Sequence, residues 1–275
     1  MSSTWEIKEP QTIALGGVRS VRTRLIAGSL NIVGTDSEPR LEVSSIKGRP
    51  LQVRLSDRGE LFIGYDWGDD RPGLLRWVKN LGFRRHEATI SLAVPRNCVV
   101  DLGAVSSTLM LSGLRAGAEV QNVSGEITLT GLAGRVSVRN ISGSVEAAGI
   151  DGDLRVNVIS GGLTLADLAG ESVDAQTVSG SILMDVADPS VQSIRAHSTS
   201  GSLTVRIPKD ADLRVKLHTT SGTLKADLPD SEGSNWQLPG MRVVDAKLGA
   251  GSGRLAADTV SGSITLLRRE VDDIA

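Results

Sequence analysis

A Ser-Gly pair followed by alternating small and aliphatic residues recurs along this chain, and it constrains the fold more than any other feature. The clearest copy reads NVSGEITLTG at residues 122–131. The serines of this copy and the later ones are Ser124, Ser142, Ser160, Ser179, Ser200, Ser221 and Ser261. Their spacing is 18 to 21 residues, apart from a last step of 40, which is the length of two repeats. Such a period predicts a repeat architecture in which each unit contacts its neighbours.

Two positions after the serine are apolar in every aligned copy. The third residue after it is Leu109, Ile127, Val145, Leu163, Ile182, Leu203, Leu224 or Ile264, where Leu109 belongs to a degenerate copy with its serine at Ser106. The fifth residue is also apolar and the one between them is mostly polar, as in a strand with one buried face. The positions four and six residues before the serine repeat this pattern. The residue directly before the serine is apolar in most copies; we read it as inward, which breaks the alternation and predicts a bend at Ser-Gly.

Two short strands and two turns within about 18 residues form a coil that is too thin to bury its own apolar stripe. Stacked coils would lay each aliphatic position on the next at about 4.8 Å. The sequence therefore predicts an all-β fold, a parallel β-solenoid or β-helix of 18 to 21 residues per coil, right-handed by the general chirality of parallel crossovers. Aromatic residues make up only 3% of the chain and glycine contributes 31 residues, which suits a thin aliphatic core with repeated tight turns.

The domain organisation expected from these repeats is a single solenoid domain over residues 18–268. Residues 1–17 form an N-terminal lead-in and residues 269–275 a C-terminal tail. Two segments interrupt the repeats, an insertion at 66–88 and a stretch rich in Pro, Gly and Ser at 228–254, which we expect to be an irregular excursion.

The SGS-I-x-L repeats, together with the VPRNCVVD segment at 94–101, resemble the bacterial putative-adhesin family of Ser-Gly β-strand-repeat proteins, a domain of unknown function. The resemblance covers residues 18–268 and rests on the rhythm of the repeats. It implies a β-solenoid-like fold and an adhesive or envelope-associated role, and it implies no catalytic residues. The N-terminal residues do not read as a secretory signal, and no apolar run is long enough to span a bilayer, so a cytoplasmic location, peripheral to the membrane, is the expectation.

The insertion at 66–88 differs in composition from the repeats. Its apolar residues recur at helical spacing, which predicts a short amphipathic helix. This helix could cap an open end of the solenoid. Alternatively, it could dock onto a protein partner or an anionic membrane surface, with binding strengthened in a homo-oligomer. The candidate docking residues are Arg76, Trp77, Lys79, Arg84 and Arg85.

Three histidines and one cysteine are the remaining candidates for chemistry. His197 and His218 each lie three residues before a Ser-Gly, so we expect them on neighbouring coils as part of an exposed polar ladder. A shared metal is the alternative, but the sequence supplies no third ligand beside them. His86 is expected to be a solvated residue at the end of the insertion, and Cys98 a buried, inert thiol.

The sequence therefore points to no catalytic residue, no cofactor and no metal. A formal charge of −2 and a pI near 6.0 give no general attraction to nucleic acid. The function expected is a non-enzymatic solenoid scaffold or adhesin-like binding module, linked to the cell envelope or to envelope stress. Two alternatives stay open: a carbohydrate-active enzyme on a β-helix face, and a self-assembling filament of the cytoskeletal type.

Overall fold

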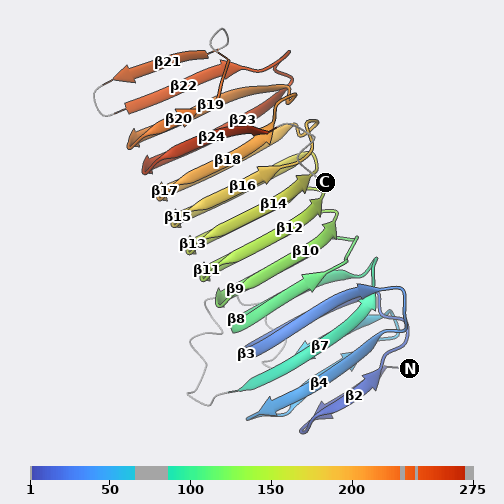
Figure 1. The fold of residues 1–275 in the computed structure, drawn as a ribbon. Helices are drawn as coiled ribbons and strands as arrows, with labels where there is room; N and C mark the ends of the chain where they lie inside the picture. The colour runs from blue at the N-terminus through green and yellow to red at the C-terminus, as the bar shows by residue number, and fades with distance from the viewer. Residues whose placement is uncertain (1, 66–85, 230–232, 239–240, 270–275) are drawn as a thin grey trace. The chain divides into compact units, whose positions relative to one another are not determined.

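All the regular structure in the described part of the chain is β-strand (Figure 1). The computed structural model describes residues 2–65, 86–229, 233–238 and 241–269. The chain divides into two compact units, residues 1–140 (unit 1) and 141–275 (unit 2). The prediction of an all-β, solenoid-like fold is confirmed. The single domain over 18–268 and the right-handed winding stay predictions, as does the helix of the insertion, because residues 66–85 lie outside the described residues.

Each regular coil of unit 2 has two strands. The corresponding strands of neighbouring coils pair in parallel, so the unit contains two rows of strands. The first strands of three successive coils are β13 (Leu154–Ser160), β15 (Ser172–Ser179) and β17 (Ser193–Ser200). The second row consists of β12 (Val145–Asp151), β14 (Leu163–Ala169), β16 (Ile182–Val186) and β18 (Leu203–Pro208). In this row Val145 pairs with Leu163, Leu163 with Ile182 and Ile182 with Leu203, and all four side chains are buried. The predicted aliphatic column is therefore confirmed within this unit.

The last coil of the chain is inserted between two earlier coils. Its strands are β23 (Gly253–Ser261) and β24 (Ile264–Arg269). They pair in parallel with β17 and β18 on one side, and with β19 (Leu213–Ser221) and β20 (Leu224–Ala226) on the other. The order of coils in space therefore departs from their order in the sequence, and the step of 40 residues between serines reflects this return.

The segment 228–254 contains an ordered hairpin, so the expectation of an irregular excursion is wrong. Its strands are β21 (Gly233–Leu238) and β22 (Met241–Lys247), which pair antiparallel, and β22 also pairs antiparallel with β19 (Figure 1). Alternation of apolar residues in MRVVDAK gives β22 a buried face, with Val244 and Ala246 inward. The hairpin thereby supplies β19 with a second neighbour.

Unit 1 also holds an inserted strand. The 16-residue strand β3 (Ser20–Thr35) pairs in parallel with β8 (Val99–Ser112) along most of its length. On its other edge β3 pairs with β6 (Glu60–Gly64) and β7 (Glu87–Pro95). Beyond β8 the parallel rows continue with β9 (Ala118–Ser124) and β10 (Ile127–Ala133), and β11 (Val136–Ser142) pairs with β9.

Antiparallel strands finish the other side of unit 1. They are β4 (Arg40–Lys47) against β7, β5 (Leu51–Leu55) against β6, β2 (Gln11–Ala14) against β4, and β1 (Ser3–Ile7) against β5. The N-terminal residues 1–17 thus contribute two sheet strands, where the sequence led us to expect only a lead-in.

The Ser-Gly corner is built by glycine geometry and by buried polar side chains. Gly180 has a φ of 150°, and a Cβ on it would lie 2.0 Å from the carbonyl oxygen of Gly161 on the next coil, so only glycine fits. In most copies a buried polar side chain two residues before the serine donates to a corner carbonyl of a neighbouring coil, as the Asn122 amide does to Ser107 O at 3.2 Å and the Thr219 hydroxyl to Gly262 O at 3.1 Å. These bonds satisfy carbonyls that the turn would otherwise leave without partners. The exceptions are Val158, which is apolar, and Thr177, whose hydroxyl has no hydrogen-bond partner among the described residues.

The residue directly before the serine points outward, so our interpretation of this position as inward is wrong. Ile159, Val178 and Val260 are each about half exposed. The alternation continues through the buried residue two before the serine and this outward residue, and it breaks at the serine, which is also exposed; the glycine that makes the turn comes next. The prediction of two strands and a corner was right, but the apolar character of this position was not the reason.

The ends of the insertion are anchored in the core of unit 1. Tyr65, directly before the insertion, and His86, near its end, are both buried, with ring centroids 5.4 Å apart. The backbone N–H of Arg49 donates to His86 Nδ1 at 3.0 Å. His86 is therefore a buried hydrogen-bond acceptor, and the expectation of a solvated residue is wrong. Cys98 is fully buried, as predicted, and burial raises its pKa to about 11.

Candidate functional site

The outward side of four adjacent strands in unit 2 carries the two histidines singled out from the sequence. These strands lie in the order β17, β23, β19, β22, and we call their outward side the outer face. Register-matched residues on neighbouring strands point to the same side of a sheet, about 4.8 Å apart. Outward side chains on these strands therefore form ladders that run across the four strands.

Asp258 separates the two histidines. It is register-matched to His197 on one side and to His218 on the other, so the expectation that the histidines occupy neighbouring coils is wrong. His218 Nδ1 lies 3.7 Å from a carboxylate oxygen of Asp258. The cause is the insertion of β23, which the chain order of the repeats does not reveal. The described residues contain no group of three His, Cys, Asp or Glu arranged to hold a metal ion.

A row of three cations crosses the same face. Arg254 on β23 is matched to Arg214 on β19, and Arg214 is matched to Lys247 on β22. All three side chains are exposed. Two residues further along the strands, Arg195 and Lys216 add two more exposed cations on β17 and β19. We call Arg254, Arg214 and Lys247 the basic row.

The basic row is unfavourable for the isolated fold. Like charges directly opposite one another on adjacent strands destabilise a sheet. No ion pair links these three side chains to a carboxylate of the described residues. The nearest carboxylates are Asp212, which precedes Arg214 by two residues and accepts from the Ser252 hydroxyl, Asp245, opposite Lys216, and Asp258, between the histidines. The sequence signal for the row is an arginine seven residues before Ser221 and again before Ser261. This signal is incomplete, because Lys247 joins the row only through the antiparallel hairpin.

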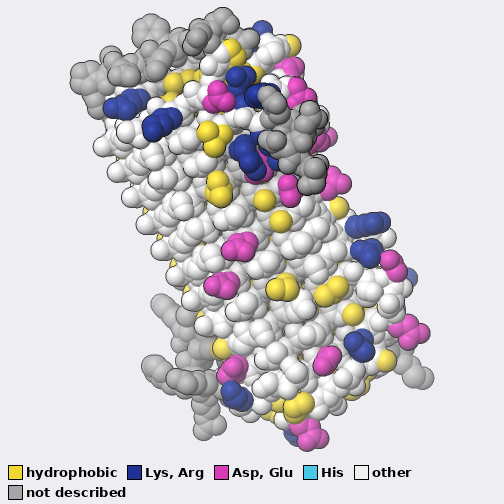
Figure 2. Space-filling model, viewed as in Figure 1, with side chains coloured by type: hydrophobic (Ala, Val, Ile, Leu, Met, Phe, Trp, Pro, Cys, Tyr) yellow, Lys and Arg dark blue, Asp and Glu magenta, His cyan; other side chains and the backbone are white. Residues whose placement is uncertain are grey.

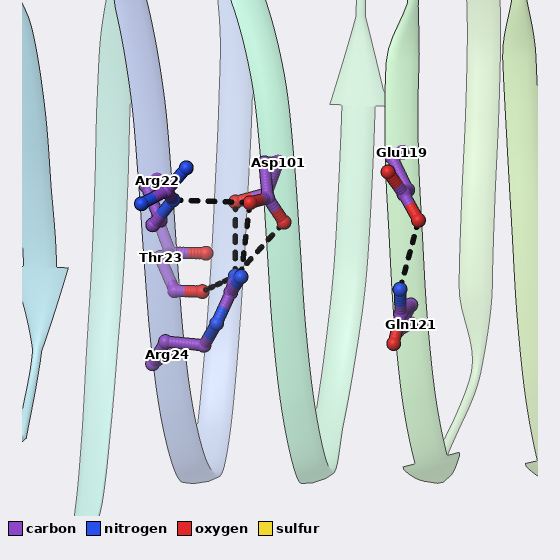
Figure 3. Close-up of polar contacts among 6 residues, drawn as sticks. All are labelled: Arg22, Thr23, Arg24, Asp101, Glu119 and Gln121. Atoms are coloured by element: carbon purple, nitrogen blue, oxygen red, sulfur yellow. Dashed lines mark hydrogen bonds and ion pairs between the residues drawn. The ribbon is translucent and has the colours of Figure 1, made fainter. Parts of the chain in front are cut away.

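A second polar cluster, in unit 1, joins the inserted strand β3 to β8 (Figure 3). Arg24 Nη1 and Nη2 donate to the two carboxylate oxygens of Asp101, both at 2.9 Å, and Arg22 Nε donates to the same group at 3.1 Å. Gly103 allows this approach, since the Arg24 side chain lies where a Cβ at that position would contact it. On the next strand, β9, Gln121 donates to Glu119 at 2.8 Å. The cluster is internally paired, so it serves the fold.

Unit 2 holds a cluster of the same composition on another face. Figure 2 shows charged side chains gathered over β18, β24 and β20, whereas they are sparse over β12 to β16. There Asp185 accepts from Arg206 Nε at 3.0 Å and from Arg269 Nη1 at 3.3 Å. Only 12% of the Asp185 side chain and 12% of the Arg269 side chain are exposed. This cluster is also paired, and it fastens β24 to β16 across β18.

The other candidates from the sequence belong to the insertion. Arg76, Trp77, Lys79, Arg84 and Arg85 lie outside the described residues. Their role as docking residues therefore stays a prediction, as does the capping role of the insertion. No helix in the described ranges has the length and apolar character needed to cross a membrane.

Comparison with known proteins connects the chain to one family. The family model described as Toastrack DUF4097 matches residues 27–267. No curated protein matches the chain.

Solved structures of similar chains have been described as adhesion proteins. A putative cell adhesion protein from Clostridium sporogenes is 16% identical, with 98% of this chain and 99% of that chain covered and a TM-score of 0.24. A putative adhesin from Parabacteroides distasonis is 11% identical, with 98% and 97% covered and a TM-score of 0.38. A putative adhesin from Bacteroides fragilis is 12% identical, with 97% and 96% covered and a TM-score of 0.27.

Proposed function

The chain belongs to the Toastrack DUF4097 family, and from this premise we propose that it is a non-enzymatic, adhesin-like binding module of the cell envelope. In this proposal the solenoid coils are a scaffold, and the outer face of unit 2 is the binding surface. Solenoid repeats commonly bind through extended faces of this kind.

The observation that carries the proposal is the uncompensated basic row on the outer face. Arg254, Arg214 and Lys247 are exposed on adjacent strands, where their mutual repulsion works against the fold. A feature that works against the fold and faces solvent is best explained by a partner. The two internally paired clusters, at Asp101 and Asp185, have no such need.

A binding role also fits the two groups whose pKa is raised by burial. Burial raises the pKa of Tyr65 to about 12 and that of Cys98 to about 11. Both side chains are inside unit 1, with 3% and 0% exposed, where a large substrate cannot reach them. The catalytic alternative on a β-helix face would need acid and base groups open to the substrate.

Retention on isolated bacterial envelope fractions tests the proposal, with membranes and cell-wall sacculi assayed separately. The whole protein should bind at least one fraction saturably and release no soluble sugar from it. Ala256→Trp places a bulky uncharged side chain at the centre of the outer face, between Arg195 and Lys216. We expect it to weaken retention roughly tenfold, as blocking part of a contact surface does.

Ala166→Trp on β14 is the matched control, since Ala166 is also partly exposed but lies on the other row of strands. Retention equal to that of the unaltered protein is expected for this variant. The proposal fails if no envelope fraction retains the protein, or if both tryptophan variants bind like the unaltered chain. Release of soluble sugar would favour the carbohydrate-active enzyme. Sedimentation of the protein by itself, with no envelope fraction added, would favour the self-assembling filament.

A further inference from the structure

The outer face is strongly basic within a unit that is acidic as a whole. Residues 141–275 contain 12 Lys and Arg against 18 Asp and Glu. The four strands of the outer face nevertheless present five exposed cations, Arg195, Arg214, Lys216, Lys247 and Arg254, together with the two carboxylates Asp245 and Asp258. A local excess of positive charge on an acidic unit indicates an anionic partner.

We propose that the outer face docks onto a membrane surface through the headgroups of anionic phospholipids. This inference rests on the proposed binding function and names the partner of the same face. The contact is electrostatic, made by the basic row together with Arg195 and Lys216.

The arrangement of the cations favours a surface over a small anion. An exposed ion pair in water contributes little by itself. A single phosphate would need a cradle of backbone N–H groups or a desolvated site, whereas these side chains stand on the open side of a sheet. Useful binding therefore requires a partner that meets several of these cations at once.

The arrangement also favours a surface over a linear polyanion. The cations occupy two registers, the basic row and the position two residues beyond it, on four adjacent strands. Because outward side chains on these strands all stand on one side of the sheet, one plane of headgroups can meet them together. A polyanion lying along the basic row would meet three of the five cations and pass by Arg195 and Lys216.

Co-sedimentation of the full chain with vesicles tests this inference. Vesicles of phosphatidylcholine with phosphatidylglycerol are compared with vesicles of phosphatidylcholine alone. The protein should bind only the anionic vesicles, and less as salt is added, since salt screens exposed charges. Each Lys or Arg near an anionic membrane strengthens binding roughly fivefold, so Arg214→Gln, Arg254→Gln and Lys247→Gln together should weaken it on the order of 100-fold.

A control with the same change in charge is available. Arg115, Arg139 and Lys225 are exposed cations outside the outer face, and their replacement by Gln should leave vesicle binding within about twofold of the unaltered chain. The basic-row variant should also unfold at the same or a slightly higher temperature, because it removes like-charge repulsion. This result excludes a loss of binding through misfolding.

A second measurement does not depend on these substitutions. Ser193 is register-matched to Arg254 and partly exposed, and Cys98 is buried, so a Ser193→Cys variant can be labelled selectively with a polarity-sensitive dye. The dye should report transfer toward the lipid when anionic vesicles are added. A dye at Thr164→Cys on β14 should not respond.

Any one of four results would overturn the inference. The first is that the basic-row variant binds anionic vesicles as well as the unaltered chain does. The second is that only replacement of Trp77, Arg84 and Arg85 abolishes binding, and this result would assign docking to the insertion. The third is that soluble polyphosphate binds as tightly as the vesicles, which would assign the face to a linear polyanion. The fourth is that envelope sacculi retain the protein while anionic vesicles do not, in which case the binding function stands and the lipid partner is wrong.

Discussion

Two strands that complete the sheets, β3 in unit 1 and β24 in unit 2, are each inserted between coils from elsewhere in the chain, and each is fastened by arginines to one aspartate. In unit 1, β3 supplies Arg22 and Arg24 to Asp101 on β8. In unit 2, β24 supplies Arg269 to Asp185 on β16, and Arg206 on β18 completes the cluster.

The two clusters differ in burial and not in chemistry. About a third of the Asp101 and Arg24 side chains is exposed, whereas 12% of Asp185 and of Arg269 is exposed. Water and salt screen the first cluster, while the second holds charges in a less polar environment. We therefore expect the same ion-pair composition to contribute little to stability on the half-open face and more in the closed one.

Removing Asp185 should have the largest effect. Asp185→Ala leaves Arg269 largely buried without its carboxylate partner, and a broken buried pair typically costs about 3–5 kcal/mol. Urea unfolding of the full chain should show this loss. Asp185→Asn is the companion variant, which keeps the volume but removes the charge. A loss below about 1 kcal/mol for Asp185→Ala would erase the difference between the two clusters.

Removing Asp101 should have a smaller effect. Asp101→Ala breaks a partly exposed cluster, so the free energy of unfolding should fall by about 1 kcal/mol or less. The loss should shrink further at high salt, whereas the loss from Asp185→Ala should change little. Urea midpoints of both variants at low and high salt measure this contrast. Equal salt dependence of the two would show that burial does not distinguish them.

The smallest effect is expected at the turn that leads into the inserted coil of unit 2. The Ser252 hydroxyl donates to Asp212 Oδ2 at 2.8 Å, and this bond is the main cause that lowers the pKa of Asp212 below its usual 3.8. A lowered folded-state pKa stabilises the fold above the usual pKa, and this contribution is lost as the pH falls through the folded-state value. Ser252→Ala should therefore lower the urea midpoint slightly at neutral pH.

The same difference should vanish at a pH acid enough to protonate Asp212 in the folded chain. NMR titration of the Asp212 carboxyl gives the direct check, because its pKa should rise in the Ser252→Ala variant. An unchanged pKa would mean that the backbone N–H groups of Gly251 and Ser252 suffice to hold it down.

The candidate site was only partly accessible from the sequence. The position three residues before the serine identified His197 and His218 as outward polar residues, but placed them on neighbouring coils. Asp258 lies between them because β23 returns to that gap. The basic row escaped notice for a related reason: Lys247 is in an antiparallel strand with no Ser-Gly to align it, so only the pairing of β22 with β19 brings it beside Arg214.

By itself the sequence determined which residues of each coil face inward and where each coil bends. Alternation of apolar residues sets the buried side of a strand, and a glycine without Cβ is needed where two corner backbones nearly touch. Both requirements are local, so the sequence of a single repeat is enough to identify them.

Only the tertiary structure decided which coil lies beside which. Every coil offers the same aliphatic column at the same register, so Leu203 can stack on Ile264 as well as on Leu224, and apolar contact alone does not select between them. The selection requires groups far apart in the chain, such as the Arg269–Asp185 pair and the hairpin that pairs with β19. The outer face, assembled from four such strands, exists only once that order is set.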